Sequence, residues 1–199
     1  MRVSWQQFEN DVMSCQACEL YRTCTHKVPG QGDPLSPLML IGEGPGQRED
    51  EQGLAFVGPA GQLLTKMLAA ISLPRERVYI CNVVKCRPPQ NRQPTPEEQE
   101  ACFPLLREQT ALIRPRVILL LGATAVNRVL GPDYRITRCR GKWIEKKGCW
   151  ILATYHPSAL LRDVSKKKDA WQDLQVLRDK LVELGLFNDL LNKQQVTEE

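Results

Sequence analysis

Four short apolar runs, separated by segments with helical spacing, constrain the fold of this chain most. The runs have the length and branched side chains of buried strands, and they span 38–41, 78–84, 117–121 and 150–154. Parallel strands must be joined by crossovers that return over the sheet, and these crossovers are usually helices. The alternation therefore predicts an α/β fold in which a parallel sheet carries helices on both faces.

The segments between these runs carry helix signals. Apolar residues of 63–71 fall on one helical face. The sequence Thr95-Pro96-Glu97-Glu98 is typical of a capping box with proline at the first helical position. Segments 122–130 and 169–186 predict two further helices, and Lys146-Lys147-Gly148 predicts the turn of a local hairpin.

The chain of 199 residues is long enough for one well-buried core, so we expect a single domain over 1–186 and a polar tail over 187–199. No apolar run has signal-peptide length at the N-terminus, and the longest run, 117–121, is too short to cross a bilayer. We therefore expect a cytoplasmic protein without a membrane partner. The formal charge of +4 permits contact with nucleic acid but does not require it.

The cysteines indicate a metal centre. Eight cysteines in a reducing compartment favour metal binding or catalysis over a disulfide framework. Cys15 and Cys18 form a C-x2-C pair, which places two thiolates within reach of one centre. Cys86 and Cys102 are widely separated, whereas a zinc site is more often completed by a second close pair. The spacing favours an iron–sulfur cluster, whose ligands come from separated loops, and it leaves zinc or unliganded thiols as alternatives.

Four cysteines remain outside this set. Cys24 lies near the close pair and is an alternative ligand. Cys81 and Cys149 lie in strand runs, where a free cysteine is usually a small buried hydrophobic residue. The pattern assigns no role to Cys139.

Polar side chains gather where the predicted strands end. In an open parallel sheet the ligand site lies outside the carboxyl ends of the strands. These ends are Gly42-Glu43-Gly44-Pro45-Gly46, Asn82, Gly122-Ala123-Thr124 and Tyr155-His156-Pro157-Ser158. A carboxylate, an amide and an imidazole are therefore expected at one edge of the sheet.

The glycine-rich loop after the first strand is a poor phosphate site. A dinucleotide-binding fingerprint would need glycine where Gln47 stands, and Pro45 removes an amide from the loop. Glu43, Glu49 and Asp50 add negative charge that would repel phosphate. The glycines instead allow the backbone to approach a flat ligand closely.

Two aromatic side chains are candidates for ligand contact. His156 precedes a proline at a strand end, and a structural histidine is the alternative. Phe56 lies in "GLAFVGPAG", whose glycines would leave its ring accessible for stacking on a base, with packing as a loop anchor as the alternative. His26 has no such context and is expected at the surface.

Seven segments, taken in order, resemble the family 4 uracil-DNA glycosylases, the iron–sulfur branch of the uracil-DNA glycosylase superfamily. They are "CQAC", "GEGPGQRED", "FVGPAGQLL", "NVVKCRPPQNR", "RPRVILLLGATA", "ITRCRGKW" and "YHPSALLR". The resemblance implies a three-layer αβα sandwich with a central four-stranded parallel sheet. It also implies a structural [4Fe–4S] cluster held by Cys15, Cys18, Cys86 and Cys102.

The implied reaction is hydrolysis of the bond between uracil and deoxyribose in DNA, after the base has been flipped out of the duplex. In family terms Phe56 stacks on uracil, and backbone at Gly42 and Gly44 completes the pocket. Asn82 pairs with the polar edge of the base. An amide can donate to a uracil carbonyl and accept from its ring N–H, whereas cytosine reverses that pattern.

The resemblance also implies the chemical roles. His156 donates to the O2 oxygen of uracil, where negative charge develops as the bond breaks. Glu43 orients the attacking water or stabilises the cationic sugar, with Glu49 in reserve. The best-known branch of the superfamily has "GQDPY", whose aspartate and tyrosine are replaced here by Gly44 and Gly46, so thymine must be rejected elsewhere in the pocket.

The segment "HPSALLR" is expected to supply a wedge. Leu160 or Leu161 would enter the minor groove, with Arg162 and Lys166–Lys168 near phosphates, although a solvated helix start is the alternative for the lysines.

Two other interpretations are a non-catalytic DNA-binding or polymerase-associated domain of the same fold, and a zinc-stabilised nucleotide-binding protein. We expect a monomer, and the sequence leaves open whether a polymerase clamp is a partner.

Overall fold

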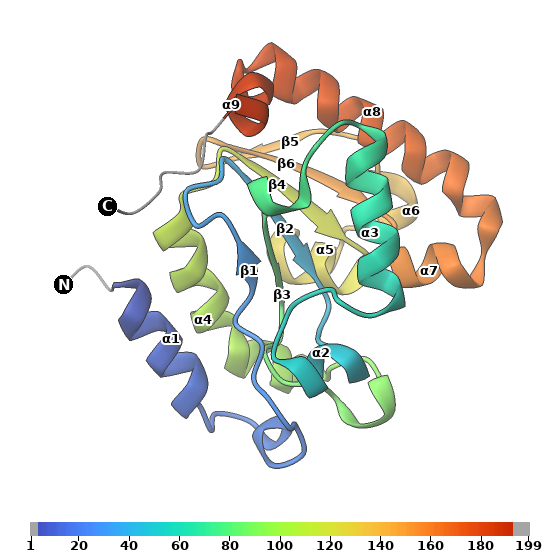
Figure 1. Ribbon diagram of the computed structural model, residues 1–199. Helices are drawn as coiled ribbons and strands as arrows, with labels where there is room; N and C mark the ends of the chain where they lie inside the picture. Colours follow the sequence, from blue (N-terminus) through green and yellow to red (C-terminus); the bar gives the residue numbers. More distant parts are fainter. Residues whose placement is uncertain (1–3, 193–199) are drawn as a thin grey trace.

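The computed structural model describes residues 4–192 and contains one six-stranded sheet with helices on both faces (Figure 1). The strand order is β1-β3-β2-β4-β6-β5. The strands are β1 Gln31–Gly32, β2 Leu38–Gly42, β3 Tyr79–Asn82, β4 Val117–Leu121, β5 Ile144–Lys146 and β6 Cys149–Thr154.

The strand pairing is parallel inside the sheet and antiparallel at both edges. β2 pairs in parallel with β3 and β4, and β4 pairs in parallel with β6. β1 pairs antiparallel with β3, and β5 pairs antiparallel with β6. The predicted mixed α/β class is confirmed. The inner strands β3, β2, β4 and β6 pair in parallel, and the antiparallel edge strands β1 and β5 widen the sheet to six strands.

The predicted hairpin is confirmed as β5–β6. Lys146 pairs with Cys149, so Lys147 and Gly148 form a two-residue turn. Both have positive φ, 53° and 76°. Two successive positive φ angles match the twist of the flanking strands, which is why glycine is favoured at the second position.

Helices occupy most of the remaining described chain. The α-helices are α1 Trp5–Ser14, α2 Gln47–Gln52, α3 Pro59–Ala70, α4 Pro96–Ile113, α5 Ala123–Leu130, α6 Ile136–Cys139, α7 Pro157–Arg162, α8 Lys167–Glu183 and α9 Leu186–Asn192. The 3-10 segments are η1 Glu19–Arg22, η2 Arg75–Arg77, η3 Pro89–Asn91 and η4 Val164–Lys166.

The helix predicted over 169–186 is found as α8, which ends at Glu183, and a separate helix, α9, follows it. Gly185 adopts a φ of 71° between α8 and α9. Leu186 and Leu190 of α9 are buried in the core. The polar tail expected from residue 187 therefore begins with a packed helix, and 193–199 lie outside the described residues.

The core has two halves, one on each face of the sheet, because successive strand residues point to opposite faces. Leu38 and Leu40 of β2 face α3, α7, α8 and α9, whereas Met39 and Ile41 face α4 and α5. Figure 1 shows the same division, with α3 and α8 on one side of the sheet and α4 on the other. The inner strands all end at the edge where α2, α5 and α7 begin.

None of the helices in the described part of the chain combines the length and the apolar character needed to cross a membrane.

Candidate active site

A cavity of about 660 Å³ lies where the inner parallel strands end. Glu43 follows β2, Asn82 ends β3, Gly122 follows β4 and His156 follows β6, and all four line the cavity. The structure therefore brings together the carboxylate, the amide and the imidazole that the sequence placed at one edge of the sheet.

His156 is held as a neutral imidazole. Burial, assisted by the charge of Arg162, lowers its pKa to about 4. The backbone N–H of Ser158 donates to Nδ1 at 3.1 Å, so Nδ1 must be the unprotonated nitrogen. The proton of the neutral ring therefore lies on Nε2, which is buried and has no partner among the described residues. His156 thus presents one unused hydrogen-bond donor.

Asn82 presents the complementary group. The residue is 1% exposed, and its Oδ1 is buried without a partner in the described chain. Buried polar atoms are almost always hydrogen-bonded, and an exception commonly marks a place that a ligand fills. Oδ1 of Asn82 is therefore an unused acceptor in the same cavity as the Nε2 donor of His156.

Phe56 forms an aromatic wall beside these two groups. Its ring centroid lies 5.6 Å from that of His156, with an angle of 35° between the ring planes. The residue is 6% exposed and has a φ of 54°, a left-handed conformation that is uncommon for a side chain of this size. It lines the cavity and also packs in the core, and its stacking on a base stays a prediction.

Gly42 acts by leaving space. A Cβ at this position would lie 2.5 Å from Oδ1 of Asn82 and 2.5 Å from Cζ of Phe56. Gly42 does not itself line the cavity, whereas Gly44 does. Only glycine therefore lets the amide and the ring approach the end of β2 this closely.

Glu43 is oriented by a neighbour that the sequence did not single out. Thr124, at the start of α5, donates from its hydroxyl to Oε2 of Glu43. Thr124 is buried, whereas Glu43 is partly exposed to the cavity. The only sequence signal for Thr124 is its place just after the third inner strand.

Glu49 and Asp50 support loops. Oε1 of Glu49 accepts from the backbone N–H groups of Val57 and Gly58 at 2.8 and 2.7 Å, next to Phe56. Oδ1 of Asp50 accepts from the amides of Thr25 and His26. Both carboxylates are buried, and Glu49 also lines the cavity. These contacts leave Glu43 as the carboxylate that is not held by backbone amides.

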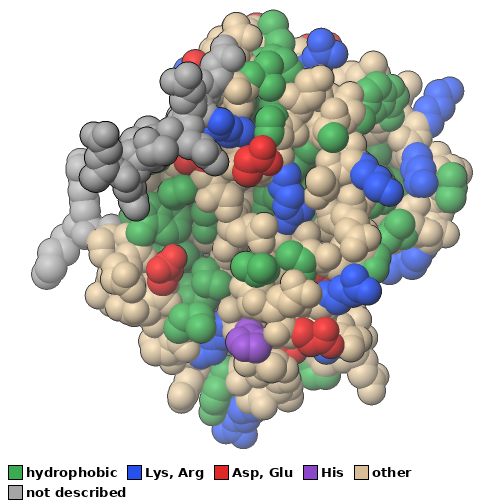
Figure 2. Space-filling model, viewed as in Figure 1, with side chains coloured by type: hydrophobic (Ala, Val, Ile, Leu, Met, Phe, Trp, Pro, Cys, Tyr) green, Lys and Arg blue, Asp and Glu red, His purple; other side chains and the backbone are tan. Residues whose placement is uncertain are grey.

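The two wedge candidates lie in different surroundings. Leu160 is 2% exposed and packs in the core, whereas Leu161 is 49% exposed. Arg162 and Lys166 line the cavity. Figure 2 shows basic side chains over the end of the molecule that carries α7 and α8. Of the two leucines, only Leu161 is available at the surface.

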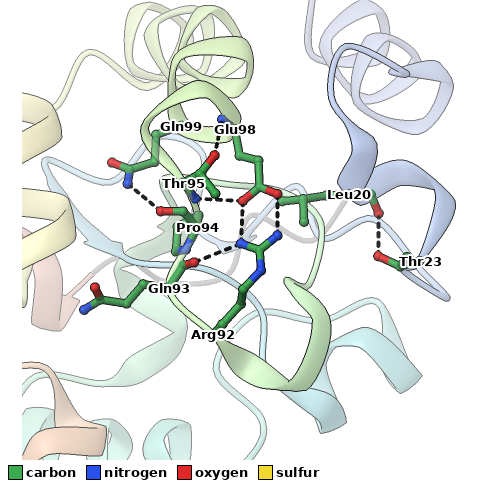
Figure 3. A network of polar contacts seen from close by, with 8 residues as sticks. All are labelled: Leu20, Thr23, Arg92, Gln93, Pro94, Thr95, Glu98 and Gln99. Atoms are coloured by element: carbon green, nitrogen blue, oxygen red, sulfur yellow. Dashed lines mark hydrogen bonds and ion pairs between the residues drawn. The ribbon is translucent and has the colours of Figure 1, made fainter.

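The proline-rich loop forms another part of the cavity wall, which the sequence did not predict. Asn91, Arg92 and Gln93 line the cavity. Arg92 makes two hydrogen bonds to the carboxylate of Glu98, at 2.8 and 2.6 Å, and Glu98 also accepts from the backbone N–H of Thr95 (Figure 3). The capping box of α4 is therefore confirmed, and it anchors this loop.

The four cysteines expected to bind a metal line a second, smaller pocket. Cys15, Cys18, Cys86 and Cys102 all contribute to it, from the end of α1, the loop after β3 and α4. Burial is the main cause that raises the pKa of the Cys18, Cys86 and Cys102 thiols. Within residues 4–192 no three His, Cys, Asp or Glu side chains form a compact group that could hold one metal ion.

The remaining cysteines are placed as follows. Cys24 does not line this pocket, although it lies close enough to Cys86 to contribute to the raised pKa of that thiol. Cys81 is fully buried in β3, as expected, and Cys149 is partly buried at the start of β6. Cys139 is buried in α6. His26 is exposed, as expected.

Residues 29–175 match the family model of the uracil-DNA glycosylase superfamily. The chain belongs to this superfamily. It is 48% identical to a type-4 uracil-DNA glycosylase of Thermotoga maritima, over 78% of this chain and 82% of the relative. It is 46% identical to a type-4 uracil-DNA glycosylase of Archaeoglobus fulgidus, over 76% of this chain and 80% of the relative.

A more distant relative places the superfamily fold in a larger protein. The chain is 29% identical to a DNA polymerase of Bacillus phage SP01 over 75% of this chain, which corresponds to 16% of that polymerase. A domain similar to this uracil-DNA glycosylase superfamily member therefore occurs as a small part of a much longer chain.

Proposed function

We propose that this chain is a monofunctional uracil-DNA glycosylase of base-excision repair, which flips uracil out of DNA and hydrolyses its N-glycosidic bond to leave an abasic site. One observation supports this most directly. The buried acceptor of Asn82 and the buried donor of His156 lack partners among the described residues and line the same cavity as Phe56. The type-4 relatives carry the same activity in their names.

Base recognition would depend on Asn82 and Phe56. Oδ1 of Asn82 would accept from the ring N–H of uracil, and its amide NH₂ would donate to the adjacent carbonyl. Cytosine presents an acceptor and an amine in these places, so it would meet two mismatched contacts. Phe56 would stack on the flat face of the base, and the backbone beside Gly44 would close the pocket.

Bond cleavage would depend on His156. Departing uracil carries negative charge on O2, and the Nε2–H of a neutral imidazole can donate to it without a change of protonation. A donor of this kind is worth about 3–4 kcal/mol of transition-state stabilisation. The low pKa of His156 supports this role because the ring is neutral throughout the physiological range.

Water activation is assigned to Glu43. The sugar becomes cationic as uracil leaves, and a carboxylate on the cavity wall can orient water towards it and stabilise the charge. Glu49 is the reserve candidate, but its carboxylate accepts from two backbone amides. Glu43 lines the cavity and accepts a hydrogen bond from the hydroxyl of Thr124.

DNA binding would use Leu161 as the wedge that fills the gap left by the flipped nucleotide. Its exposure supports this choice over Leu160. Arg162 and Lys166 at the cavity would contact phosphates, with Lys167 and Lys168 behind them at the start of α8.

A [4Fe–4S] cluster would be held by Cys15, Cys18, Cys86 and Cys102. The donor set fits, because four cysteines line one pocket. Burial raises the pKa of the Cys18, Cys86 and Cys102 thiols, and a bound cation would favour their ionisation. When bound, the cluster supplies a covalent connection between the N-terminal segment, the loop after β3 and α4. Absorbance near 400 nm, about where thiolate-to-iron charge transfer occurs, distinguishes it from zinc.

We further propose a single glycosylase domain that extends beyond the expected boundary at 186 to include α9, acting as a monomer in the cytoplasm. A non-catalytic, polymerase-associated role is the second candidate, which the similarity to the phage DNA polymerase favours. That role gives no reason to keep both unpartnered polar atoms of Asn82 and His156 in one cavity.

The deciding experiment is release of free uracil from a uracil-containing oligonucleotide, with an alkali-labile abasic site left behind. We expect His156→Ala to lower kcat by roughly 100- to 1000-fold while DNA affinity stays within about twofold. Asn82→Asp should admit cytosine. Binding of uracil-containing DNA by the cluster-loaded protein without any turnover would support the non-catalytic role instead.

A further inference from the structure

Lys85 is a buried cation without a carboxylate partner. It is 1% exposed, and no ion pair within the described part of the chain includes it. A charge removed from water is costly unless nearby groups compensate it. The groups around Lys85 must therefore compensate the cost of burying its charge.

The ammonium group holds the backbone of Asn82. Nζ of Lys85 donates to the carbonyl oxygen of Asn82 at 2.9 Å and to Oε1 of Gln109 at 2.6 Å. The amide nitrogen of Gln109 donates in turn to the hydroxyl of Tyr79 and the carbonyl of Pro29, which fixes Oε1 towards Lys85. Lys85 thus restrains the residue whose side-chain acceptor opens into the substrate cavity.

The other side of Lys85 faces the cysteine pocket. Its backbone N–H donates to Sγ of Cys102 at 3.3 Å, and Lys85, Cys86 and Cys102 all line that pocket. Four thiolates around an iron–sulfur core carry net negative charge, which attracts a nearby cation across a region of low dielectric. The two acceptors that the ammonium contacts are neutral, so an occupied cysteine centre would be the nearby source of compensating negative charge.

We propose that Lys85 is a positioning residue that couples the cysteine centre to uracil recognition, by holding the backbone of Asn82 with an ammonium group whose charge the occupied centre compensates. This inference rests on the proposed function. It adds a specific consequence. Loss of the ammonium group should make the side chain of Asn82 less well positioned for uracil and should make the bound cluster easier to lose.

The test compares Lys85→Met, which keeps the length of the side chain and removes its charge, with wild type. Turnover is normalised to the fraction of each protein that binds an abasic-site oligonucleotide, which removes any effect of misfolded protein. We expect kcat for uracil release to fall at least tenfold with KM for DNA unchanged, and the preference for uracil over cytosine to narrow. We also expect iron loss to a chelator, followed at 400 nm, to be at least tenfold faster.

Two further variants keep the test decisive. Gln109→Met removes one acceptor of the ammonium and should shift kcat and iron release in the same direction, which covers the case in which Lys85→Met does not fold. Tyr79→Phe removes one of the two acceptors that orient Gln109 and should change both readouts less than Gln109→Met does, because the carbonyl of Pro29 still accepts from the amide. Normal turnover, selectivity and iron retention in Lys85→Met or Gln109→Met would overturn the inference while uracil release by wild type still upheld the proposed function.

Discussion

At the scale of single residues, the hydroxyl of Thr124 restrains the one cavity carboxylate that is not bound to backbone amides. A glutamate side chain has three rotatable bonds, and holding it in one orientation costs about 1–2 kcal/mol of conformational entropy. Thr124 is buried and donates to Glu43, so this restraint exists before substrate arrives. Glu43 is therefore preorganised by a residue that does not need to touch substrate.

Thr124→Val should lower kcat for uracil release by about tenfold, because valine keeps the shape of threonine but lacks the hydroxyl donor. A tenfold change corresponds to roughly 1.4 kcal/mol, the size of an ordinary hydrogen bond. KM should change little. Thr124→Ser restores the hydroxyl and should recover most of the rate. Equal rates for the valine and serine variants would contradict the positioning of Glu43 by Thr124.

His156 gives a prediction for stability against pH. Its folded pKa is about 4, below the value of about 6.5 expected in an unfolded chain. Between these pH values the unfolded state binds more protons, so the contribution of His156 to the free energy of unfolding falls as pH falls. The free energy of unfolding, measured with urea, should therefore fall more from pH 7 to pH 4.5 for wild type than for His156→Gln. His26→Gln, which changes an exposed ring, is the control, and a pH-independent difference for His156→Gln would contradict the prediction.

At the scale of elements, the start of α4 organises the proline-rich loop. The carboxylate of Glu98 belongs to the capping box and also accepts hydrogen bonds from Arg92 (Figure 3). The hydrogen bond from Arg92 is the main cause that lowers the pKa of Glu98. Arg92 lines the cavity. A local helix signal in the sequence therefore fixes one wall of the site.

Glu98→Gln should keep the capping box and lose the ion pair, at a cost of about 1 kcal/mol because Arg92 is partly exposed. A carboxyl with a depressed pKa stabilises the fold above its unfolded pKa and loses this contribution as pH falls. The stability gap to wild type, measured by thermal unfolding, should therefore shrink below about pH 4. Glu97→Gln changes an exposed neighbour that has no arginine partner among the described residues, and it should show a smaller gap.

The sequence predicted those parts of the fold that follow from the spacing of apolar residues and from the position of a residue at the end of a strand. The inner strands were found because runs such as 117–121 are apolar throughout, and Glu43, Asn82 and His156 were found because parallel strands end together. β1 has only two residues and leaves no pattern. Thr124 and Lys85 could not be assigned, because their roles depend on where a side chain points across elements that are distant in sequence.

At the scale of the whole molecule, α7 places two adjacent leucines on opposite sides of the boundary between core and solvent. Leu160 packs in the core, and Leu161 is exposed beside a cavity lined by Arg162 and Lys166. With the wedge role proposed for Leu161, one turn of helix would carry a residue for folding and a separate residue for DNA binding.

Leu161→Ala should lower kcat/KM on duplex DNA by about tenfold or more, since the gap left by the flipped base would stay unfilled, and should change single-stranded DNA cleavage much less. Its melting temperature should match wild type. Leu160→Ala should instead destabilise the fold by about 2–5 kcal/mol. A Leu161→Ala variant with unchanged duplex cleavage would exclude a wedge role.

The close approach at Gly42 has a practical consequence for redesign of this protein. Because even a methyl group there would lie 2.5 Å from Oδ1 of Asn82 and from Cζ of Phe56, a side chain has no room behind these two cavity-lining residues. An engineer who wants the enzyme to accept a larger or differently substituted base must make space at other walls of the cavity and leave position 42 unaltered.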